Sequence, residues 1–395
     1  MGDKLLLNLA EKYGLPLYVY DANIIKQQYD KLKSSFDFDI KIKYACKALT
    51  NLSVLRFLKN LGAGLDVVSV EELEIGLLAG FSPKDIVFTP SSAHFDDVVY
   101  ALDKGVIVHI DDLYNLELFG KKYGGSRPVG IRFNPLVLAG SNSNVSTGHI
   151  NSKFGILSTQ LDDVLSLVSK YNIVVEGLHV HTGSDISDVS KFLDGVDVLF
   201  HMIDKFSTLK YLDLGSGFKV KYKESDVTTD LVLLGKELKS RILALNKDID
   251  VFIEPGKFLV SECGFFLVEC TTVKNNEGRL FAGVNSGFNH LLRPMFYGAY
   301  HEIINLSNPS GNLVEYDVVG YICEEDTFAK KRMINEIKPK DILCFKNAGA
   351  YCFSMSSNYN SRLRPAEVLI LEGKDYLIRE RESLSNILAN QKQIF

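Results

Sequence analysis

The sequence lacks several patterns that would assign it to a common class of protein. Its six cysteines include no C-x-x-C pair, which argues against a zinc ribbon and favours reduced thiols in the cytoplasm over a disulfide framework. Its net charge of -5 argues against nucleic acid as the main partner. No apolar run approaches the length of a membrane span, and the first residues lack the pattern of a signal peptide.

Two nucleotide-binding motifs are also missing. No G-x-x-x-x-G-K-[ST] motif occurs, and the segment "GSGFKV" from Gly215 does not match G-x-G-x-x-G. Nucleoside triphosphates and dinucleotides are therefore not expected as ligands. The chain has 395 residues, of which 46% are hydrophobic and 24% charged, as in a soluble globular enzyme of about two domains.

Apolar, β-branched runs alternate with helical stretches from about Lys41 to Glu254, for example "VEELEIGLLAG" from Val70 and "LYNLELFGKKYG" from Leu113. This alternation predicts a parallel sheet with crossover helices, and the number of strands predicts a (β/α)8 TIM-type barrel of the α/β class. An open, doubly wound sheet is the alternative. The candidate strands are Lys41–Cys46, Leu65–Val68, Ile86–Thr89, Val106–Ile110, Val129–Phe133, Val174–Val180, Tyr211–Leu214 and Val251–Ile253.

After Glu254 the sequence has few helical periods and contains strand-like segments separated by turns. These segments are "FFLVECTTVKN", "RLFAGVNS", "VEYDVVGYIC", "DILCFKNAGAY" and "AEVLILEGKDYLI". They predict a mostly β C-terminal domain, and "LPLYVYD" near the start of the chain could join it as a strand. We therefore expect an N-terminal strand segment (1–30), a barrel (31–265) and a β-rich domain (266–395).

Polar residues and glycines gather at the ends of the candidate barrel strands. In (β/α)8 enzymes the catalytic groups lie at the C-terminal ends of the strands, so these positions mark the expected active site. The positions are Lys47, Asp66, Ser69, His109, Arg132, Asn134, His181, Gly215–Gly217 and Glu254–Lys257.

Lys47 ends an apolar strand, where its amine could be either a solvated group or a covalent attachment point. Gly215, Gly217 and the Pro255–Gly256 pair follow strands seven and eight, where this barrel tends to bind phosphate, although tight turns alone would also explain glycines. A lysine together with a phosphate site favours pyridoxal 5'-phosphate, an aldehyde cofactor that a lysine holds as a Schiff base.

Two further residues fit this cofactor. Glu254 would keep the pyridine nitrogen protonated, and His181 would stack on the ring. His179 and His181 share one face of their strand and could instead bind zinc, but the barrel hydrolases that use such a pair need further ligands at other strand ends. No other candidate strand ends on a histidine, so a metal is not expected. His179 alone could equally be a hydrogen-bonded core histidine.

Nine motifs occur in a characteristic order along nearly the whole chain. They are "YACKA" around Lys47, "GAGLDVVSVEEL", "HINSKFG", "HVHTGSD", "LDLGSGF", "EPGKF", "RPMFYGAYH", "CEEDTFA" and "GAYCFSMSSNYNSRLRPAE". In these motifs the sequence resembles the diaminopimelate decarboxylases, pyridoxal-phosphate enzymes of the alanine-racemase-like barrel group. The resemblance implies a homodimer with active sites at the interface.

The resemblance also implies roles for single residues. Lys47 would carry the cofactor, His181 would stack on it, and Cys323 would donate a proton after CO2 leaves. The cofactor site would also be lined by Gly215, Gly217, Glu254, Pro255, Gly256, Lys257 and Tyr351. Substrate would contact Lys257, Arg293, Tyr297, Glu324 and Tyr351. In the homodimer, Cys323 and Glu324 would come from the partner chain.

Three features depart from the family pattern. The usual "EPGR" is "EPGK", so Lys257 replaces an arginine that is expected to bind a substrate carboxylate, and a lysine lacks the bidentate fork. The usual glycine triplet is "GSG", and "CEEDTFA" is one residue shorter than the common form. The first and third put the fine geometry of substrate binding in doubt and leave the cofactor chemistry in place.

Diaminopimelate presents an ammonium and a carboxylate at its distal end. Arg293 suits the carboxylate and Glu324 suits the ammonium, although a surface salt bridge between the two is the alternative. The expected reaction converts meso-2,6-diaminopimelate to L-lysine and CO2, the last step of lysine biosynthesis. The alternatives are decarboxylation of carboxynorspermidine, ornithine or arginine, and a catalytically inactive regulatory homologue.

Overall fold

The computed structural model describes residues 1–137 and 148–395. The chain forms two compact units, each of which is described by itself below. The barrel unit consists of Lys26–Lys221 and Val227–Leu259, and the β unit consists of Met1–Ile25, Tyr222–Asp226 and Val260–Phe395. The domain limits expected from the sequence, at residues 30 and 265, stay a prediction.

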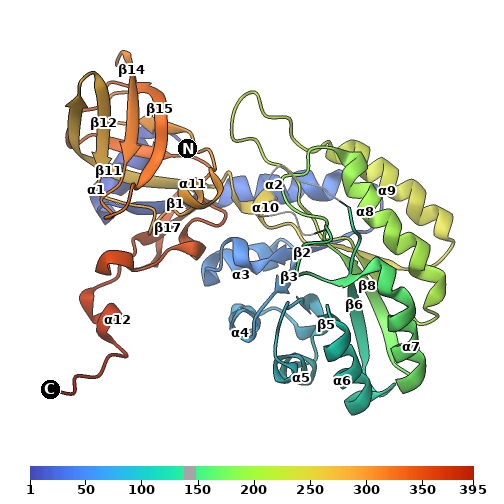
Figure 1. Ribbon diagram of the computed structural model, residues 1–395. Coiled ribbons are helices and arrows are strands. Elements are labelled where there is room, and N and C mark those ends of the chain that lie inside the picture. Colours follow the sequence, from blue (N-terminus) through green and yellow to red (C-terminus); the bar gives the residue numbers. More distant parts are fainter. Residues whose placement is uncertain (138–147) are drawn as a thin grey trace. The chain divides into compact units, whose positions relative to one another are not determined.

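The described residues of the barrel unit contain a closed ring of eight parallel strands, several of which are labelled in Figure 1. The ring closes because β5 pairs with β6 and β10 pairs with β2, which confirms the predicted (β/α)8 barrel and shows that the open-sheet alternative is wrong. A short strand, β7 (Ile156–Leu157), extends the sheet beside β6. The ring strands are β2 (Lys41–Ala45), β3 (Gly64–Val67), β4 (Ile86–Phe88), β5 (Ile107–Ile110), β6 (Pro128–Asn134), β8 (Val174–Val180), β9 (Tyr211–Asp213) and β10 (Asp250–Ile253).

Helices follow the strands and lie around the barrel (Figure 1). Side-chain caps fix where several of them begin: Ser69 accepts a hydrogen bond from the backbone of Glu72, and Asp112 accepts one from Asn115. The two helical stretches predicted from Val70 and Leu113 are α4 and α6. The helices are α2 (Ala22–Ser34), α3 (Leu52–Asn60), α4 (Val70–Ala79), α5 (Phe95–Lys104), α6 (Leu113–Tyr123), α7 (Leu161–Tyr171), α8 (Val189–Met202) and α9 (Leu231–Leu245), followed by the short α10 (Lys257–Val260).

Two aromatic side chains stack among the buried residues of the barrel strands. The rings of Tyr211 and Phe252 stack with centroids 4.7 Å apart, and Val87 packs against them. Gly177, on the neighbouring strand, leaves room for this stack, since a Cβ there would lie 1.9 Å from the ring of Tyr211. A glycine inside a strand, which costs backbone entropy, is thus explained by packing.

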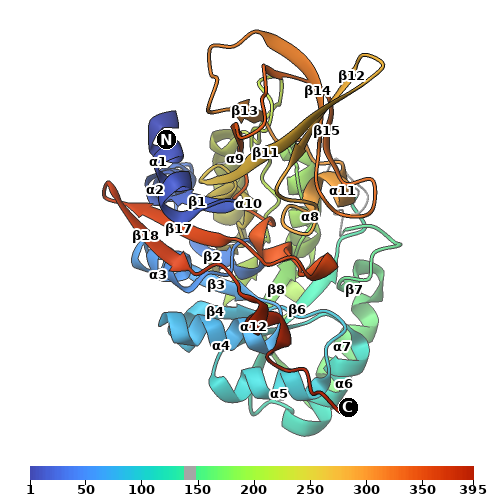
Figure 2. The ribbon, with the colours of Figure 1, turned by 90° about the vertical axis from the view of Figure 1, so that its left-hand side faces the viewer.

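The β unit is built around a mixed sheet in which the N-terminal strand is central (Figure 2). Strand β1 (Leu17–Asp21) pairs antiparallel with β11 and parallel with β17, so the prediction that "LPLYVYD" joins the C-terminal strands is confirmed. The other strands are β11 (Gly264–Asn276), β12 (Arg279–Val284), β13 (Ile303–Asn305), β14 (Leu313–Val319), β15 (Thr327–Asn335), β16 (Ile342–Phe345), β17 (Ala366–Leu371) and β18 (Lys374–Arg379).

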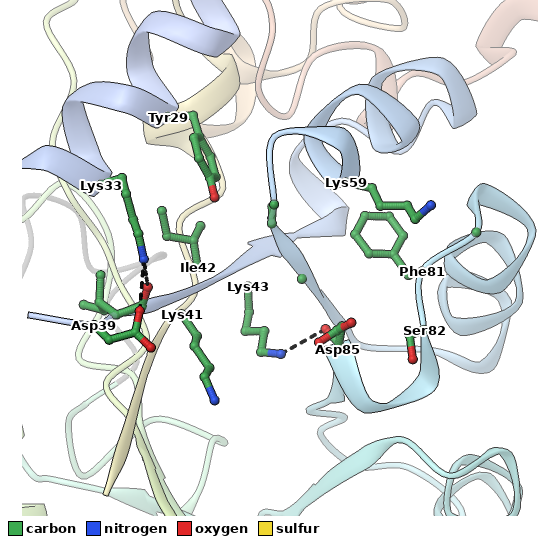
Figure 3. Close-up of a pocket in the computed structure, with 15 residues that line it drawn as sticks. Tyr29, Lys33, Asp39, Lys41, Ile42, Lys43, Lys59, Phe81, Ser82 and Asp85 are labelled. Atoms are coloured by element: carbon green, nitrogen blue, oxygen red, sulfur yellow. Dashed lines mark hydrogen bonds and ion pairs between the residues drawn. The ribbon is translucent and has the colours of Figure 1, made fainter.

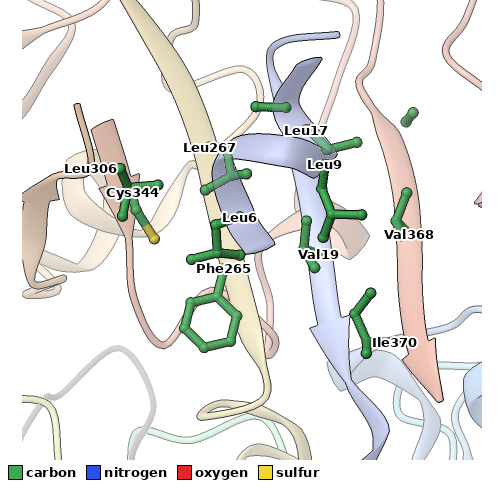
Figure 4. Packing of buried hydrophobic residues seen from close by; sticks show 12 residues of the cluster. Leu6, Leu9, Leu17, Val19, Phe265, Leu267, Leu306, Cys344, Val368 and Ile370 are labelled. Carbon is green, nitrogen blue, oxygen red and sulfur yellow. The ribbon is translucent and has the colours of Figure 1, made fainter. Parts of the chain in front are cut away.

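The core of the β unit lies between the sheet and helix α1 (Asp3–Tyr13), as Figure 4 shows. Leu6 and Leu9 of α1 lie on one face of the helix and pack over Leu17 and Val19 of β1. Neighbouring strands add Leu267 and other apolar side chains to this cluster. Two short helices, α11 (Arg293–Tyr297) and α12 (Leu384–Leu388), complete the unit. Within the two described ranges, no helix is both long and apolar enough to cross a membrane.

Candidate active site

Lys47 lies in a single 3-10 turn, Cys46–Ala48, directly after β2. Its ammonium forms an ion pair with Asp66 of β3, with Nζ 3.1 Å from Oδ2. The lysine side chain is 44% exposed, whereas the Asp66 side chain is 2% exposed. Burial and the Glu254 carboxylate raise the pKa of Asp66 to about 6, although Lys47 opposes the shift. The strand end therefore presents an accessible amine held by a buried acid.

Three buried groups lie together at the ends of β8, β9 and β10: His179, Asp213 and Glu254. His179 Nε2 lies 3.1 Å from Oε2 of Glu254. Burial and the neighbouring Glu254 carboxylate raise the pKa of Asp213 well above its ordinary value. Among the described residues, His179 Nδ1, Asp213 Oδ2 and Glu254 Oε1 are buried with no hydrogen-bond partner. Such orphaned atoms are costly, which points to a bound group that completes them.

His109 of β5 contacts this group through His179. The two imidazole rings stack with their centroids 4.8 Å apart. The two nitrogens of His109 contact the hydroxyls of Thr89, at 3.2 Å, and Tyr211, at 3.1 Å. Burial is the main cause that lowers the pKa of both histidines well below the ordinary value. Both imidazoles are therefore neutral.

His181 leaves β8 beside the turn that follows β9. Its Nδ1 accepts a hydrogen bond from the backbone N–H of Ser216 at 3.2 Å, so the proton of the neutral ring lies on Nε2. Burial and then the nearby Arg132 and Lys47 lower the pKa of His181 well below its ordinary value. Gly215 has φ +61°, and a Cβ there would lie 2.6 Å from His181 Nδ1, so only glycine allows this close approach.

The segment after β10 is fixed to the rest of the barrel by backbone bonds. The N–H of Glu254 donates to Gly215 O at 2.8 Å, and Pro255 O accepts from Ala45 at 3.2 Å. These bonds join the predicted glycine turn, the Glu254–Lys257 segment and strand β2, which directly precedes the turn that carries Lys47. The Lys257 ammonium lies 2.7 Å from Oδ2 of Asp185, and both side chains are largely buried.

The barrel also offers a possible metal donor set. His109, His179, Asp213 and Glu254 each contribute one ligand atom, and these atoms lie within 4.8 Å of one another. The zinc alternative considered from the sequence pairs His179 with His181. The donor set in the structure contains His179 but not His181. Nε2 of His179 and Oε2 of Glu254 already bond to each other, so the geometry as it stands is that of a hydrogen-bonded network.

Arg293 of the β unit is the first residue of α11 and is 5% exposed. Its Nη1 lies 3.2 Å from Nε2 of His301, and its guanidinium lies over the ring of Tyr222, 5.1 Å from the centroid. Burial raises the pKa of Cys352 to about 11, although the hydrogen bond to Arg293 opposes the shift. Arg293 is thus enclosed by a neutral imidazole, an aromatic face and a thiol.

Cys323 and Glu324 lie in the loop between β14 and β15. Asn360 Nδ2 lies 3.1 Å from the exposed thiol of Cys323, and the hydroxyl of Tyr359 donates to Glu324 Oε1. Beside them is an open pocket of about 470 Å³. Its lining is mostly apolar and comprises Phe288, Leu292, Met295, Phe296, Glu324, Ser357 and Tyr359.

Two tyrosines of the β unit were also predicted to contact ligands. Tyr297 ends α11, and burial raises its pKa. Tyr351 has φ +58°, a left-handed conformation that is uncommon for a residue with a side chain and is often found at functional sites.

A second pocket, of about 490 Å³, lies at the opposite ends of the barrel strands (Figure 3). Its lining includes Lys33, Lys41 and Lys43. These lysines do not converge: Lys33 contacts Asp39, Lys41 contacts Asp250, and Lys43 donates to the backbone oxygen of Asp85. The pocket opens where strands β2 and β3 begin, the face of such a barrel that serves stability.

Several residues of these sites were not singled out from the sequence. Asp213 lies inside the quoted motif "LDLGSGF", and its signal is a charged residue at the end of an apolar strand. The sequence places Arg132 and His109 at strand positions but predicts no role for either. His301 closes the motif "RPMFYGAYH", but nothing in the sequence indicates its contact with Arg293.

Comparison with known families identifies a match in the barrel. The family described as "Pyridoxal-dependent decarboxylase, pyridoxal binding domain" matches residues 22–261.

Curated relatives match over almost the whole chain. The diaminopimelate decarboxylase of Methanothermobacter thermautotrophicus is 37% identical over 404 residues, which cover 98% of this chain and 93% of that protein. The enzyme of the same name from Vibrio cholerae is 34% identical, with 97% and 94% covered.

A solved structure has the same fold. The crystal structure of diaminopimelate decarboxylase from Helicobacter pylori complexed with L-lysine superposes with a TM-score of 0.89 at 30% identity, covering 97% of this chain and 98% of that one.

Proposed function

This chain belongs to the pyridoxal-dependent decarboxylases and, within them, to the diaminopimelate decarboxylase family, and from this premise we propose that it converts meso-2,6-diaminopimelate to L-lysine and CO2. It is a decarboxylase whose cofactor is pyridoxal phosphate. The observation that carries the proposed reaction is the accessible amine of Lys47, which is paired with a buried acid next to the orphaned Glu254 oxygen.

The barrel residues fit the cofactor. Lys47 would hold it covalently, and the buried Glu254 Oε1 supplies the carboxylate oxygen that a protonated ring nitrogen needs. A Cβ at Gly215 or Gly217 would collide with His181 or Gly183, so the glycines keep this turn close to the histidine that we propose stacks on the cofactor. The other residues proposed to line the cofactor are His181, Gly215, Gly217, Pro255, Gly256, Lys257 and Tyr351. When bound, the cofactor takes up the electron pair that remains as CO2 departs.

We assign the proton-transfer steps to two side chains. Cys323 Sγ would donate a proton to the carbon that has lost CO2, and the Lys47 amine, whose proton is held by Asp66, would hold the cofactor again once the product leaves. His181 is neutral and held by the backbone N–H of Ser216, and it would stack on the cofactor ring without supplying a proton. Burial of His181 and the neighbouring cations keep its ring uncharged.

Substrate recognition is proposed to use opposite charges for the two distal groups. Arg293 binds the distal carboxylate and Glu324 binds the distal ammonium. Tyr297, Tyr351 and Lys257 complete the contacts. Because the Lys257 ammonium is already paired with Asp185, we propose that it contributes one point charge and less directional binding than an arginine would.

We propose that the protein works in the cytoplasm as a homodimer with its active sites at the interface. The exposed Cys323 and Glu324, beside the apolar pocket in the β unit, would then serve the active site of the neighbouring copy. The apolar lining of that pocket suits contact with another protein surface.

The proposed reaction is tested by product analysis. Purified protein with added pyridoxal phosphate is offered diaminopimelate, lysine, ornithine, arginine and carboxynorspermidine, and amine products and CO2 are measured. We expect L-lysine from diaminopimelate as the fastest reaction. Faster turnover of another amino acid would contradict the substrate, and a bound-cofactor absorbance band without any turnover would indicate an inactive homologue.

A further inference from the structure

His301 lies between a backbone carbonyl and the guanidinium of Arg293. Its Nδ1 is 2.9 Å from the oxygen of Lys346, and its Nε2 is 3.2 Å from Nη1 of Arg293. A carbonyl oxygen can only accept, so Nδ1 carries the proton of the neutral ring. Nε2 is left with a lone pair, and a guanidinium N–H donates to it. The two partners therefore determine the tautomer without ambiguity.

The imidazole is held in place by the sheet of the β unit. Lys346 directly follows β16, and its N–H donates to Glu302 O, next to the pairing of Ile303 with Phe345. The backbone oxygen of His301 accepts from Nη1 of Arg332 at 2.7 Å. His301 is 2% exposed, so the ring has little freedom to rotate away from Arg293.

The neutral state of His301 is necessary for this contact. Burial and then the charge of Arg293 lower the pKa of His301 to about 3. A protonated ring would lose its acceptor at Nε2 and would repel the guanidinium. At neutral pH the imidazole can therefore act only as an acceptor towards Arg293.

Other contacts restrict the remaining freedom of the guanidinium. The ring of Tyr222 lies against it, and the same ring meets His301 edge to face, with centroids 6.0 Å apart and planes at 81°. The Tyr222 hydroxyl is in turn bonded to Ser261 Oγ at 2.9 Å. A guanidinium has five N–H donors in one plane, so one acceptor and one aromatic face together define the direction of the fork.

We infer that His301 is a positioning residue that orients Arg293 and so sets the preference for a substrate with a carboxylate at its distal end. This inference rests on the proposed function, in which Arg293 binds that carboxylate. His301 itself touches neither the reacting carbon nor the cofactor in this assignment. It acts by orienting the guanidinium of Arg293.

The test compares diaminopimelate with lysine, which lacks the distal carboxylate. In His301→Phe, which keeps an aromatic ring and removes both ring nitrogens, we expect KM for diaminopimelate to rise about tenfold with kcat changed less than about threefold. Turnover of lysine, measured in parallel, should stay within about twofold of the wild-type value. His301→Gln, whose amide can still accept from Arg293, should recover most of the lost preference.

A double variant separates positioning from a general structural role. If His301 acts through Arg293, His301→Phe should change the substrate preference no further once Arg293→Ala is present. His290→Phe is the matched control, since His290 is an equally buried histidine of the same unit that contacts Ser286 and should leave the preference unchanged. Circular dichroism and the cofactor absorbance check the fold of each variant.

The possible failures are distinguishable. If the wild-type enzyme prefers lysine to diaminopimelate, the proposed function fails and this inference fails with it. If the wild type prefers diaminopimelate and His301→Phe keeps that preference, the inference alone is overturned. An equal fall for both substrates, or a full effect of His301→Phe in the Arg293→Ala background, would also overturn it.

Discussion

His179 donates a hydrogen bond from Nε2 to Oε2 of Glu254 across 3.1 Å, and both side chains are buried. A carboxylate oxygen can only accept, so this contact fixes the proton on Nε2. It also fixes the plane of the Glu254 carboxylate, whose other oxygen has no partner within the described part of the chain. His179 thus orients the group that we expect to face the ring nitrogen of the cofactor.

Replacing His179 should weaken cofactor binding. His179→Phe removes the hydrogen bond to Glu254, and a hydrogen bond to a charged group contributes about 1.5–3 kcal/mol, so the cofactor Kd should rise about tenfold or more. Equilibrium dialysis of the purified protein measures this change. His179→Gln can still donate and should lose less, and an unchanged Kd in His179→Phe would mean that Glu254 needs no such support.

Lys47 should carry the cofactor. Reduction with borohydride should fix the cofactor to the peptide that contains "YACKAL", and Lys47→Ala should lose both this label and the absorbance of the bound cofactor. Lys41→Ala is the matched control on the same segment, because Lys41 is an exposed lysine paired with Asp250. Label found on Lys257 instead would show that the assignment is wrong.

Cys323 should affect turnover more than binding, because a proton donor acts after the substrate is bound. Cys323→Ala should keep the cofactor spectrum and lower kcat by about 10²-fold or more. All six cysteines are described, and Cys323 is the exposed one among them, so mild alkylation should label it first with a parallel loss of activity. A normal kcat in Cys323→Ala would mean that water or another group supplies the proton.

Arg293→Ala should reduce the preference for diaminopimelate over lysine. A charge-assisted contact to the distal carboxylate contributes about 1.5–3 kcal/mol, so kcat/KM for diaminopimelate should fall at least about tenfold. Turnover of lysine should hardly change. Arg279→Ala, which breaks a pair with Asp317 in the same unit, is the control. A parallel fall for both substrates would make Arg293 a structural residue.

His301 should make the folded protein sensitive to acid. Burial lowers its pKa to about 3, below the ordinary value of 6.5, so the unfolded chain binds the proton more readily than the folded one. Stability is therefore retained above pH 6.5 and is lost as the pH falls from 6.5 towards 3, by up to about 1.4 kcal/mol per pH unit. Urea unfolding measures this loss. Below pH 6.5 the free energy of unfolding of the wild type should fall by this amount relative to that of His301→Gln. A difference that does not vary with pH would contradict the buried, neutral imidazole.

The barrel could be predicted from the sequence because its strands are buried on both faces. A continuous apolar run such as Ile86–Phe88, buried at every position, then marks a strand directly. Strand β15 escaped prediction because its middle, "KKRM", is charged and largely exposed, and β13 is only three residues long. Neither carries the alternation that identifies a strand with one buried face.

The positions of some site residues could be predicted from the sequence, while their roles stay a prediction. Lys47, His181 and Glu254 follow strands in a barrel, and the rule that catalysis occurs at strand ends locates them. The contacts between His109, Tyr211 and His179 could not be predicted, because they join strands that lie far apart in the chain. The same holds for His301 and Lys346, whose contact depends on the pairing of β13 with β16.

Strand β1 lies between β11 and β17, and its Leu17 faces Leu267 on one side and Ala366 on the other. A ribosome makes about 5–20 residues per second, so Ala366 emerges on the order of 20–70 s after Leu17. Throughout that time the nascent segment "LYVYD" has exited the tunnel without its second neighbour, while the whole barrel is being made. An unpaired apolar strand is a template for wrong pairing, so this segment needs protection, as chaperones provide, until β17 has been made.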